Sequence, residues 1–247
     1  MSQLPRYAKE PTLPAAMTVR IQPWPTSPFV IVPGSRAYME TICPDKAPAG
    51  AVLIIHSWWG LTDSFRAFGS RLADAGYLVG LADLFEGQIA NTEAEARALR
   101  AQSRRTPMYK TLGADIVCLS YMAGSSINKI GVVGFSMGGH WAVWLSQRPE
   151  YNIAATVLYY AARAGDFSHC KAGILAHFAE RDPWVSAAGR RNMERAILKS
   201  GCDYDAFDYP GTQHWFAESD RTSEFNANAA NLALGRDLRH FGQLLKA

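Results

Sequence analysis

The chain has 247 residues, of which 48% are hydrophobic and 19% are charged. A chain of this length and composition can bury a sizeable core, which excludes a disordered or low-complexity protein. Its 25 Lys and Arg residues against 22 Asp and Glu give a net charge of +3, and the basic residues are scattered. Because no polycationic stripe is present, we expect a small-molecule partner and no nucleic acid.

Cysteine usage and hydropathy predict a cytoplasmic protein. The four cysteines are too few to staple a chain of this length, and none stands in a C-x-x-C pair typical of zinc or redox sites. The first residues, MSQLPRY, lack the apolar core of a signal peptide. The longest nearly apolar stretch, residues 153–162, is shorter than the roughly 20 residues that a membrane-spanning helix needs. We therefore expect no membrane association and no bound metal.

Five short runs are apolar on both faces, which is typical of strands buried from both sides in a parallel sheet. These runs span residues 51–56, 77–82, 130–134, 153–160 and 172–178. A further strand is expected over residues 203–208. Two weaker strands are expected over residues 17–22 and 36–43, after a polar, proline-punctuated arm at residues 1–15.

Helical spacing of apolar residues separates the predicted strands. The first expected helix follows the candidate caps Thr62 and Asp63, and the second begins at the capping box of Thr92 and Glu95. A third helix follows Pro107. The last two are expected over residues 186–200, where Gly201 ends the helix, and over residues 226–245. This alternation predicts a single α/β domain over residues 16–247, with helices on both faces of a mostly parallel sheet.

The most informative segment is a G-x-S-x-G motif between the predicted strand at 130–134 and a helical stretch. It centres on Ser136, with Gly134 before it and Gly138 and Gly139 after it. A sharp turn from strand to helix lifts one hydroxyl above the sheet edge, and glycines let the neighbouring backbones approach. We therefore expect Ser136 to be a nucleophile. The alternative is a glycine-rich turn with a structural serine.

A serine hydroxyl needs a general base near neutral pH, and that base needs an acid to orient it. In a sheet enzyme of this type the order along the chain is serine, acid, histidine. Asp182 comes after the predicted strand that ends at Phe178, and His214 comes after the one that ends at Asp208. Both side chains would therefore lie at the same sheet edge as Ser136.

Other residues compete for these roles. His56 ends a strand at the same edge and is the serious rival base, although it precedes the serine; we expect it behind the triad, at the substrate pocket. His140 lies four residues after Ser136, and its helix should lead its side chain away. The weaker alternatives are His169, His177 and His240 for the base, and Glu180 and Asp208 for the acid.

An oxyanion in the transition state needs N–H donors. The helix that begins after Ser136 would supply the Met137 N–H, and the loop after the first long strand would supply the Trp58 N–H. We expect Trp59 and Trp215 to help form the substrate pocket. Arg163, after the strand at 153–160, is either an anchor for an anionic substrate group or a solvated loop arginine.

With these motifs the chain resembles the dienelactone hydrolase family of α/β-hydrolases over about residues 15–245. The motifs that carry the resemblance are His56-Ser57-Trp58-Trp59-Gly60, Asp83-Leu84-Phe85, Gly134-Phe135-Ser136-Met137-Gly138-Gly139, Ala179-Glu180-Arg181-Asp182-Pro183 and Tyr209-Pro210-Gly211-Thr212-Gln213-His214. The resemblance implies the α/β-hydrolase fold and a cofactor-free hydrolase of esters or lactones, with the triad and oxyanion roles given above.

The chain departs from the best-known members of this family at three points. Those members use a cysteine nucleophile, and position 136 is serine. They carry a glutamate that interacts with the resting thiol, and that position is Ser57. The two changes agree, because a serine enzyme has no thiol to hold protonated. Two arginines that hold the substrate carboxylate in the family correspond to Gly87 and Glu218, so that clamp is missing.

The sequence thus predicts a serine hydrolase that cleaves small carboxylic esters or lactones and requires no cofactor, as a monomer or homodimer. A thioesterase or peptidase with the same triad is the nearest alternative. A binding protein without catalytic activity on the same fold is the alternative from another class. Whether residues 87–107 cover the pocket as a lid is left open.

Overall fold

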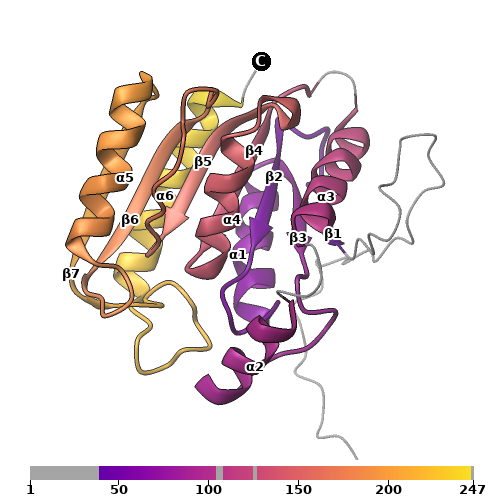
Figure 1. Cartoon of the computed structure of the whole chain (residues 1–247). Coiled ribbons are helices and arrows are strands. Elements are labelled where there is room, and N and C mark those ends of the chain that lie inside the picture. The colour runs from indigo at the N-terminus through magenta and orange to yellow at the C-terminus, as the bar shows by residue number, and fades with distance from the viewer. Residues whose placement is uncertain (1–38, 104–107, 125–126, 246–247) are drawn as a thin grey trace, which may run out of the picture.

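The computed structural model describes residues 39–103, 108–124 and 127–245. Within these residues seven strands form one sheet in the order β1-β3-β2-β4-β5-β6-β7. Strand β1 pairs antiparallel with β3, and the other neighbouring strands pair in parallel. Figure 1 shows the sheet between two layers of helices, which is the α/β arrangement that the sequence predicts.

The strands are β1 (Met39–Ile42), β2 (Gly50–Ile55), β3 (Tyr77–Ala82), β4 (Ile130–Phe135), β5 (Ile153–Tyr159), β6 (Gly173–Arg181) and β7 (Tyr204–Gln213). The α-helices are α1 (Asp63–Asp74), α2 (Glu93–Ser103), α3 (Met108–Ala123), α4 (Met137–Ser146), α5 (Ala187–Ser200) and α6 (Ala227–Leu244), and a 3₁₀ turn, η1, covers Pro149–Tyr151. No helix in the described ranges combines the length and the hydropathy needed to cross a membrane.

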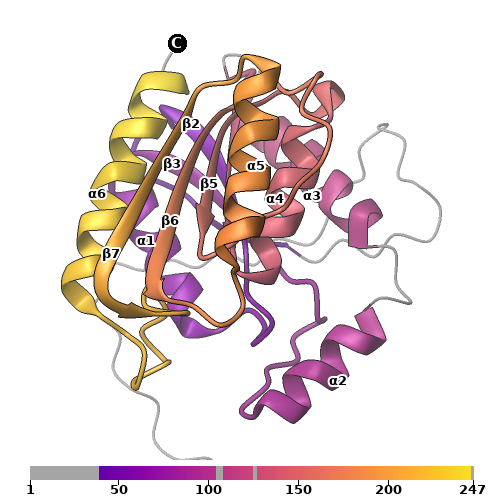
Figure 2. The ribbon, with the colours of Figure 1, turned by 60° about the vertical axis from the view of Figure 1, so that its left-hand side comes forward.

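The central strands are apolar throughout because both faces of the sheet are covered. In β2, Val52 and Ile54 belong to the core under α1 and α6, whereas Leu53 and Ile55 belong to the core under α3, α4 and α5. All four side chains are fully buried. Figure 2 shows the two helical layers on opposite sides of the sheet. Burial on both faces explains the continuous apolar runs of the sequence.

Helix ends follow the predicted caps at several positions. The capping box is present, with the Glu95 N–H donating to Thr92 Oγ1 and the Thr92 N–H to Glu95 Oε2, each at 3.2 Å. The Ser186 hydroxyl accepts from the N–H of Gly189 at 3.0 Å. Gly201 ends α5 with a φ of 79°, in the left-handed region that favours glycine. Thr62 stands at the start of α1 but makes no capping bond with its side chain.

Two strand ends differ from the prediction. Strand β6 continues to Arg181 and β7 continues to Gln213, past the expected ends at Phe178 and Asp208. The cause is an irregularity in their pairing, because Ala179 pairs with Tyr209 and Arg181 pairs with Gln213. Pairing between the two strands therefore resumes beyond this irregularity, which contains the strand-breaking residues Pro210 and Gly211.

The arm at 1–15 and the strand at 17–22 lie outside the described residues. The domain limits remain a prediction.

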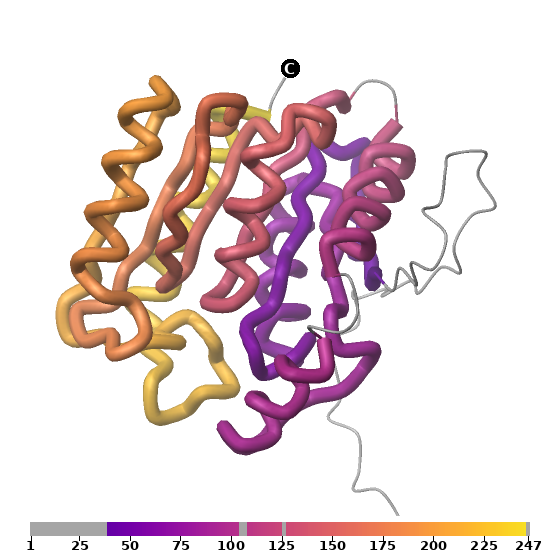
Figure 3. The backbone as a smooth tube through the Cα atoms, in the orientation of Figure 1, coloured from indigo at the N-terminus to yellow at the C-terminus, as the bar shows by residue number. Residues whose placement is uncertain are grey.

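Parallel strands place their carboxyl ends at one edge of the sheet, where binding sites of such folds gather. Figure 3 shows the segments after β2 and β7 and helix α2 at this end of the sheet. The functional site is built from these segments.

Candidate active site

Ser136 occupies the sharp turn between β4 and α4. Its backbone has φ 50° and ψ −109°, a strained conformation for a residue other than glycine. The turn is held because the Ser136 N–H donates to the Tyr159 carbonyl of β5 at 3.0 Å, and the Gly139 N–H donates to the Ser136 carbonyl at 3.0 Å. Strain at a serine between strand and helix is the geometry that presents its hydroxyl above the sheet edge.

The glycines around Ser136 are required by contacts between backbones. A Cβ atom at Gly134 would fall on the Gly138 carbonyl, and one at Gly138 would fall on the carbonyl of Ile55, at the end of β2. A Cβ at Gly139 would overlap the side chain of Ala161. Helix α4 therefore begins in direct contact with the end of β2 and with the segment after β5, the two strands that flank β4.

Ser136, His214 and Asp182 form one hydrogen-bonded chain. The Ser136 hydroxyl lies 2.8 Å from His214 Nε2, and His214 Nδ1 lies 2.7 Å from Asp182 Oδ2. Because a carboxylate only accepts, Nδ1 carries the imidazole proton and Nε2 accepts from the serine. The other carboxyl oxygen of Asp182 accepts the N–H groups of Trp184 at 2.8 Å and Val185 at 3.0 Å, which fixes its orientation.

The two expected oxyanion donors are the backbone N–H groups of Met137 and Trp58. Met137 is the first residue of α4, so its N–H has no acceptor inside the helix. Trp58 lies in the loop after β2, whose end α4 contacts. Among the described residues neither N–H donates to a backbone carbonyl.

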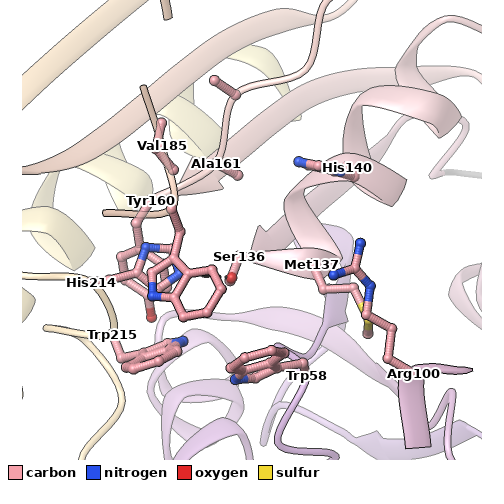
Figure 4. A pocket seen from close by; sticks show the side chains of 12 residues that line it. Trp58, Arg100, Ser136, Met137, His140, Tyr160, Ala161, Val185, His214 and Trp215 are labelled. Carbon is pink, nitrogen blue, oxygen red and sulfur yellow. Dashed lines mark hydrogen bonds between the residues drawn. The ribbon is translucent and has the colours of Figure 1, made fainter. Parts of the chain in front are cut away.

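A cavity of about 200 Å³ opens over Ser136 and His214. Figure 4 shows Trp58 and Trp215 on one side of the serine, and His140 and Arg100 on another. The remaining lining residues are Met137, Tyr160, Ala161, Ala162, Trp184 and Val185. This volume is below the roughly 300 Å³ lower limit of drug-sized pockets, so the cavity fits a small ligand.

Indole rings form the wall of the cavity. Trp58 stacks on Trp215 with ring centres 5.9 Å apart, and Trp184 meets Trp58 edge-on at 5.0 Å. The guanidinium of Arg97, on α2, lies 5.4 Å from the Trp58 ring and 5.6 Å from the Trp184 ring. These cation–π contacts hold α2 against the wall, and Arg100 of the same helix lines the cavity. Helix α2, within the stretch considered as a lid, therefore borders the pocket.

Three expectations about the pocket are corrected by the structure. His56, Trp59 and Arg163 are not among the lining residues, whereas Trp215 is. Trp59 is buried behind Trp215, with ring centres 5.2 Å apart. The Arg163 guanidinium donates to the His140 carbonyl at 3.1 Å, so it supports the helix that borders the pocket.

His56 is a core residue with both ring nitrogens hydrogen-bonded. Its Nδ1 donates to the Ser57 carbonyl at 2.5 Å, and its Nε2 accepts from the Leu84 N–H at 3.0 Å. The side chain is fully buried, and this burial lowers its pKa. A buried neutral imidazole with both nitrogens engaged has no capacity to act as the base for Ser136.

His140 was expected to point away from the nucleophile, and this was wrong. It lies one helical turn after Ser136, and residues four apart share one face of a helix, so His140 lines the cavity. Sequence reasoning also missed Arg100 and Tyr160. Tyr160 could have been found, because it directly follows β5 at the same sheet edge. Arg100 could not, since no pattern in the sequence relates α2 to the pocket.

The other candidate acids and bases have different partners. His177 is fully buried and bonds Asp237 at 2.7 Å, and His240 bonds the Gly173 carbonyl at 3.1 Å. Asp208 forms an ion pair with Arg190 at 2.7 Å. The Glu180 carboxylate accepts from the N–H of Gly211 at 2.5 Å. Asp182 is thus the carboxylate that contacts His214.

Over the described ranges there is no group of three or more His, Cys, Asp or Glu side chains that could hold a metal ion.

Glu218 lies four residues after His214 and is fully buried. Its two carboxyl oxygens bond the Ser57 hydroxyl and the Tyr160 hydroxyl, each at 2.8 Å. Burial raises the pKa of Glu218 to about 8, and the two hydroxyl donors offset part of that rise. Glu218 is therefore an interior acid outside the pocket lining.

A mostly parallel sheet with helices on both faces, and a strained serine at the carboxyl end of β4, define an α/β-hydrolase. Residues 36–245 match the family model described as "Dienelactone hydrolase family". The chain therefore belongs to the dienelactone hydrolase family, and it is a carboxylic ester hydrolase.

Individual proteins are also similar to this chain, and the solved structures among them share its fold. The chain is 27% identical over 240 residues to a protein of Saccharolobus solfataricus named as a candidate carboxymethylenebutenolidase, covering 81% of this chain and 91% of the relative. Among solved structures, the dienelactone hydrolase of Anabaena variabilis matches with a TM-score of 0.60 at 19% identity, over 87% of this chain and 96% of that one. A dienelactone hydrolase-like promiscuous phosphotriesterase from metagenomic libraries matches with a TM-score of 0.74 at 17% identity, over 83% and 92%.

Proposed function

We propose that the protein is a serine hydrolase that cleaves small carboxylic esters or lactones through an acyl-enzyme intermediate. The observation that carries the proposal is the continuous hydrogen-bonded chain from Ser136 through His214 to Asp182, with distances of 2.8 and 2.7 Å. A merely structural serine in a glycine-rich turn has no need of an imidazole that a carboxylate holds in the accepting tautomer.

In the first half-reaction Ser136 Oγ attacks the carbonyl carbon while His214 Nε2 takes the hydroxyl proton. The tetrahedral intermediate collapses, the bond from carbon to the leaving oxygen breaks, and the proton on Nε2 passes to that oxygen. In the second half-reaction water attacks the acyl group, with His214 again taking a proton. Release of the acid returns that proton to Ser136. Asp182 stabilises the imidazolium formed in each half.

The oxyanion of each intermediate would be bound by the N–H groups of Trp58 and Met137. The first N–H groups of a helix point out of its start, and the helix dipole adds a positive potential there. Removing one such donor typically costs 10²- to 10³-fold in rate. The adjoining pocket of about 200 Å³ supports a small acyl or lactone group as substrate.

The remaining properties follow from the same proposal. Hydrolysis by a serine triad needs no metal or cofactor. The described cysteines Cys43, Cys118, Cys170 and Cys202 are free, which supports the expectation of a reducing, cytoplasmic location. We propose a single catalytic domain over residues 16–247 that acts as a monomer or homodimer.

A substrate panel tests the proposal. We expect turnover of p-nitrophenyl acetate and of small lactones by the wild type, and loss of that turnover in Ser136→Ala at unchanged thermal stability. Hydrolysis of thioesters or amides without hydrolysis of esters or lactones would favour the thioesterase or peptidase alternative. Ligand binding without turnover of any of the four classes would favour the binding protein.

A further inference from the structure

Glu218 joins three segments that build the active site. The carboxyl itself belongs to the loop that begins with His214. One of its oxygens bonds Ser57, the residue before Trp58 in the loop after β2. The other oxygen bonds Tyr160, which directly follows β5. One fully buried side chain therefore connects the base, the proposed oxyanion loop and the end of a central strand.

The two hydroxyl partners bear directly on catalytic groups. The Tyr160 ring packs against the His214 imidazole with ring centres 4.8 Å apart, and Tyr160 has a strained φ of 38°. Ser57 is covalently next to Trp58, whose N–H is one of the two proposed oxyanion donors. Each hydroxyl partner of Glu218 is therefore one contact or one bond away from a proposed catalytic group.

We propose that Glu218 is a positioning residue of the active site, whose carboxyl holds the Trp58 loop and Tyr160 in place for the reaction. This inference rests on the proposed serine-hydrolase function. Both hydroxyls donate to a charged Glu218 carboxylate. When the carboxyl is protonated, one of the two bonds reverses, so that one oxygen donates its proton to a hydroxyl while the other oxygen accepts from the second. Both hydroxyls thus stay hydrogen-bonded, and no buried charge lies at Ser57, the residue before Trp58.

Charge at Glu218 would act against the reaction. An ionised carboxylate next to the Trp58 loop repels the negative charge that develops on the substrate oxygen. It would also attract the imidazolium of His214, but that cation already has the Asp182 carboxylate at 2.7 Å, so the added benefit is smaller. The pKa of Glu218, about 8, follows mainly from its burial.

The groups facing Glu218 allow this pKa to be changed selectively. In its own loop, Asp220 raises the pKa of Glu218 and Arg221 lowers it. From the other two segments, the Ser57 and Tyr160 hydroxyls lower it, because they donate to the charged form. Tyr160 itself stays neutral, since burial raises its pKa well above the ordinary value.

The test is the rate at which a small fluorophosphonate labels Ser136, measured by intact mass at pH 7 and pH 9. In the wild type this rate should fall at pH 9 as Glu218 ionises. Glu218→Gln cannot ionise, so its ratio of the rate at pH 9 to that at pH 7 should exceed the wild-type ratio by about tenfold, given a pKa near 8. The amide offers one acceptor and one donor, as the neutral acid does, so the comparison isolates the effect of the charge.

Asp115→Asn is the matched control. Asp115 is also fully buried with a pKa raised to about 8 by its burial, but it lies on α3 and does not line the pocket. Its substitution should leave the wild-type ratio of rates unchanged. If Glu218→Gln fails to fold, Tyr160→Phe supplies the test with Glu218 intact. Loss of one donor raises the pKa of Glu218 further, so the fall in labelling should move to higher pH.

Each other outcome overturns the proposal. If the ratio of the labelling rate at pH 9 to that at pH 7 is the same in the wild type and Glu218→Gln, Glu218 has only a packing role. An equal change in Asp115→Asn would show a general effect of buried acids on the fold. A folded wild type that is not labelled at either pH would overturn the serine-hydrolase function and the role of Glu218 together. A labelled wild type with unchanged ratios would overturn the role of Glu218 alone.

Discussion

Asp182 and His214 are each the first residue after a strand, and the two strands are neighbours in the sheet. The last residues of these strands, Arg181 and Gln213, pair with each other in register. The next residue of each strand therefore leaves the sheet edge at the same place, and His214 Nδ1 lies 2.7 Å from Asp182 Oδ2. The register of β6 and β7 thus sets the contact between the proposed base and its acid.

Asp182→Asn should reduce the rate of ester hydrolysis by about 10⁴-fold, because an amide can donate to Nδ1 and so favours the wrong imidazole tautomer. The matched control is Glu180→Gln, since Glu180 is exposed and bonds the backbone of Gly211. We expect activity near the wild-type value from the control in a steady-state assay. Equal losses in the two variants would contradict the assignment of Asp182.

Gly138→Ala should destabilise the fold by at least about 1–3 kcal/mol, because the added Cβ meets the Ile55 and His56 carbonyls. Gly235→Ala is the matched substitution. Gly235 lies within α6 with nothing within 4 Å of the added carbon, so alanine should stabilise the helix by up to about 1 kcal/mol. Urea unfolding of both variants measures the two changes in the free energy of unfolding. A Gly138→Ala variant as stable as the wild type would contradict the close backbone contacts at the turn between β4 and α4.

Asp115→Asn should stabilise the protein at alkaline pH. Both oxygens of Asp115 are buried and lack a hydrogen-bond partner among the described residues, and burial raises its pKa from 3.8 to about 8. The folded chain therefore holds this proton more tightly than the unfolded chain. The resulting stability is complete below about pH 4 and is lost as the pH rises towards 8, by up to about 1.4 kcal/mol per pH unit.

Urea unfolding of the wild type and Asp115→Asn at pH 5 and pH 8 measures this loss. The difference between the two proteins should shift in favour of the variant at pH 8. A difference that does not depend on pH would show that Asp115 is ionised or neutral to the same degree in both states.

Asp237→Ala should destabilise the fold without acting on the chemistry. Asp237 accepts from His177 at 2.7 Å and from the Tyr159 hydroxyl at 2.5 Å, and all three side chains are fully buried. Its removal leaves two buried donors without an acceptor, which costs about 3 kcal/mol or more. The midpoint of urea unfolding should fall, while kcat at a temperature where the variant is folded should stay near the wild-type value. A large loss of kcat in the folded variant would assign this second His–Asp pair to the site.

The sequence predicted the parts of the site that depend on local order. The motif predicts Ser136, and the order of strands and loops predicts Asp182 and His214, because parallel strands bring their carboxyl ends to one edge. The structure brings the three side chains within hydrogen-bonding distance, and their catalytic roles stay a proposal. The predicted end of β7 at Asp208 was wrong. The residues that follow, which include Pro210 and Gly211, break the strand pattern, and the ladder resumes beyond them only through pairing with β6.

Contacts between distant segments could not be predicted in the same way. Glu218 and Ser57 are 161 positions apart, and nothing in the pattern around either residue indicates that one bonds the other. Likewise, the place of Arg100 at the pocket depends on how α2 packs against Trp58 and Trp184. Such contacts are decided by the tertiary structure and have no periodicity in the chain.

The most direct test of the central claim is intact mass after treatment with a small fluorophosphonate, for the wild type and for His214→Ala. If Ser136 is activated by His214, the wild type gains one adduct per chain on Ser136 and the variant gains none in the same time. No adduct on the folded wild type, or an adduct that persists in His214→Ala at the same rate, would contradict the proposed nucleophile and base.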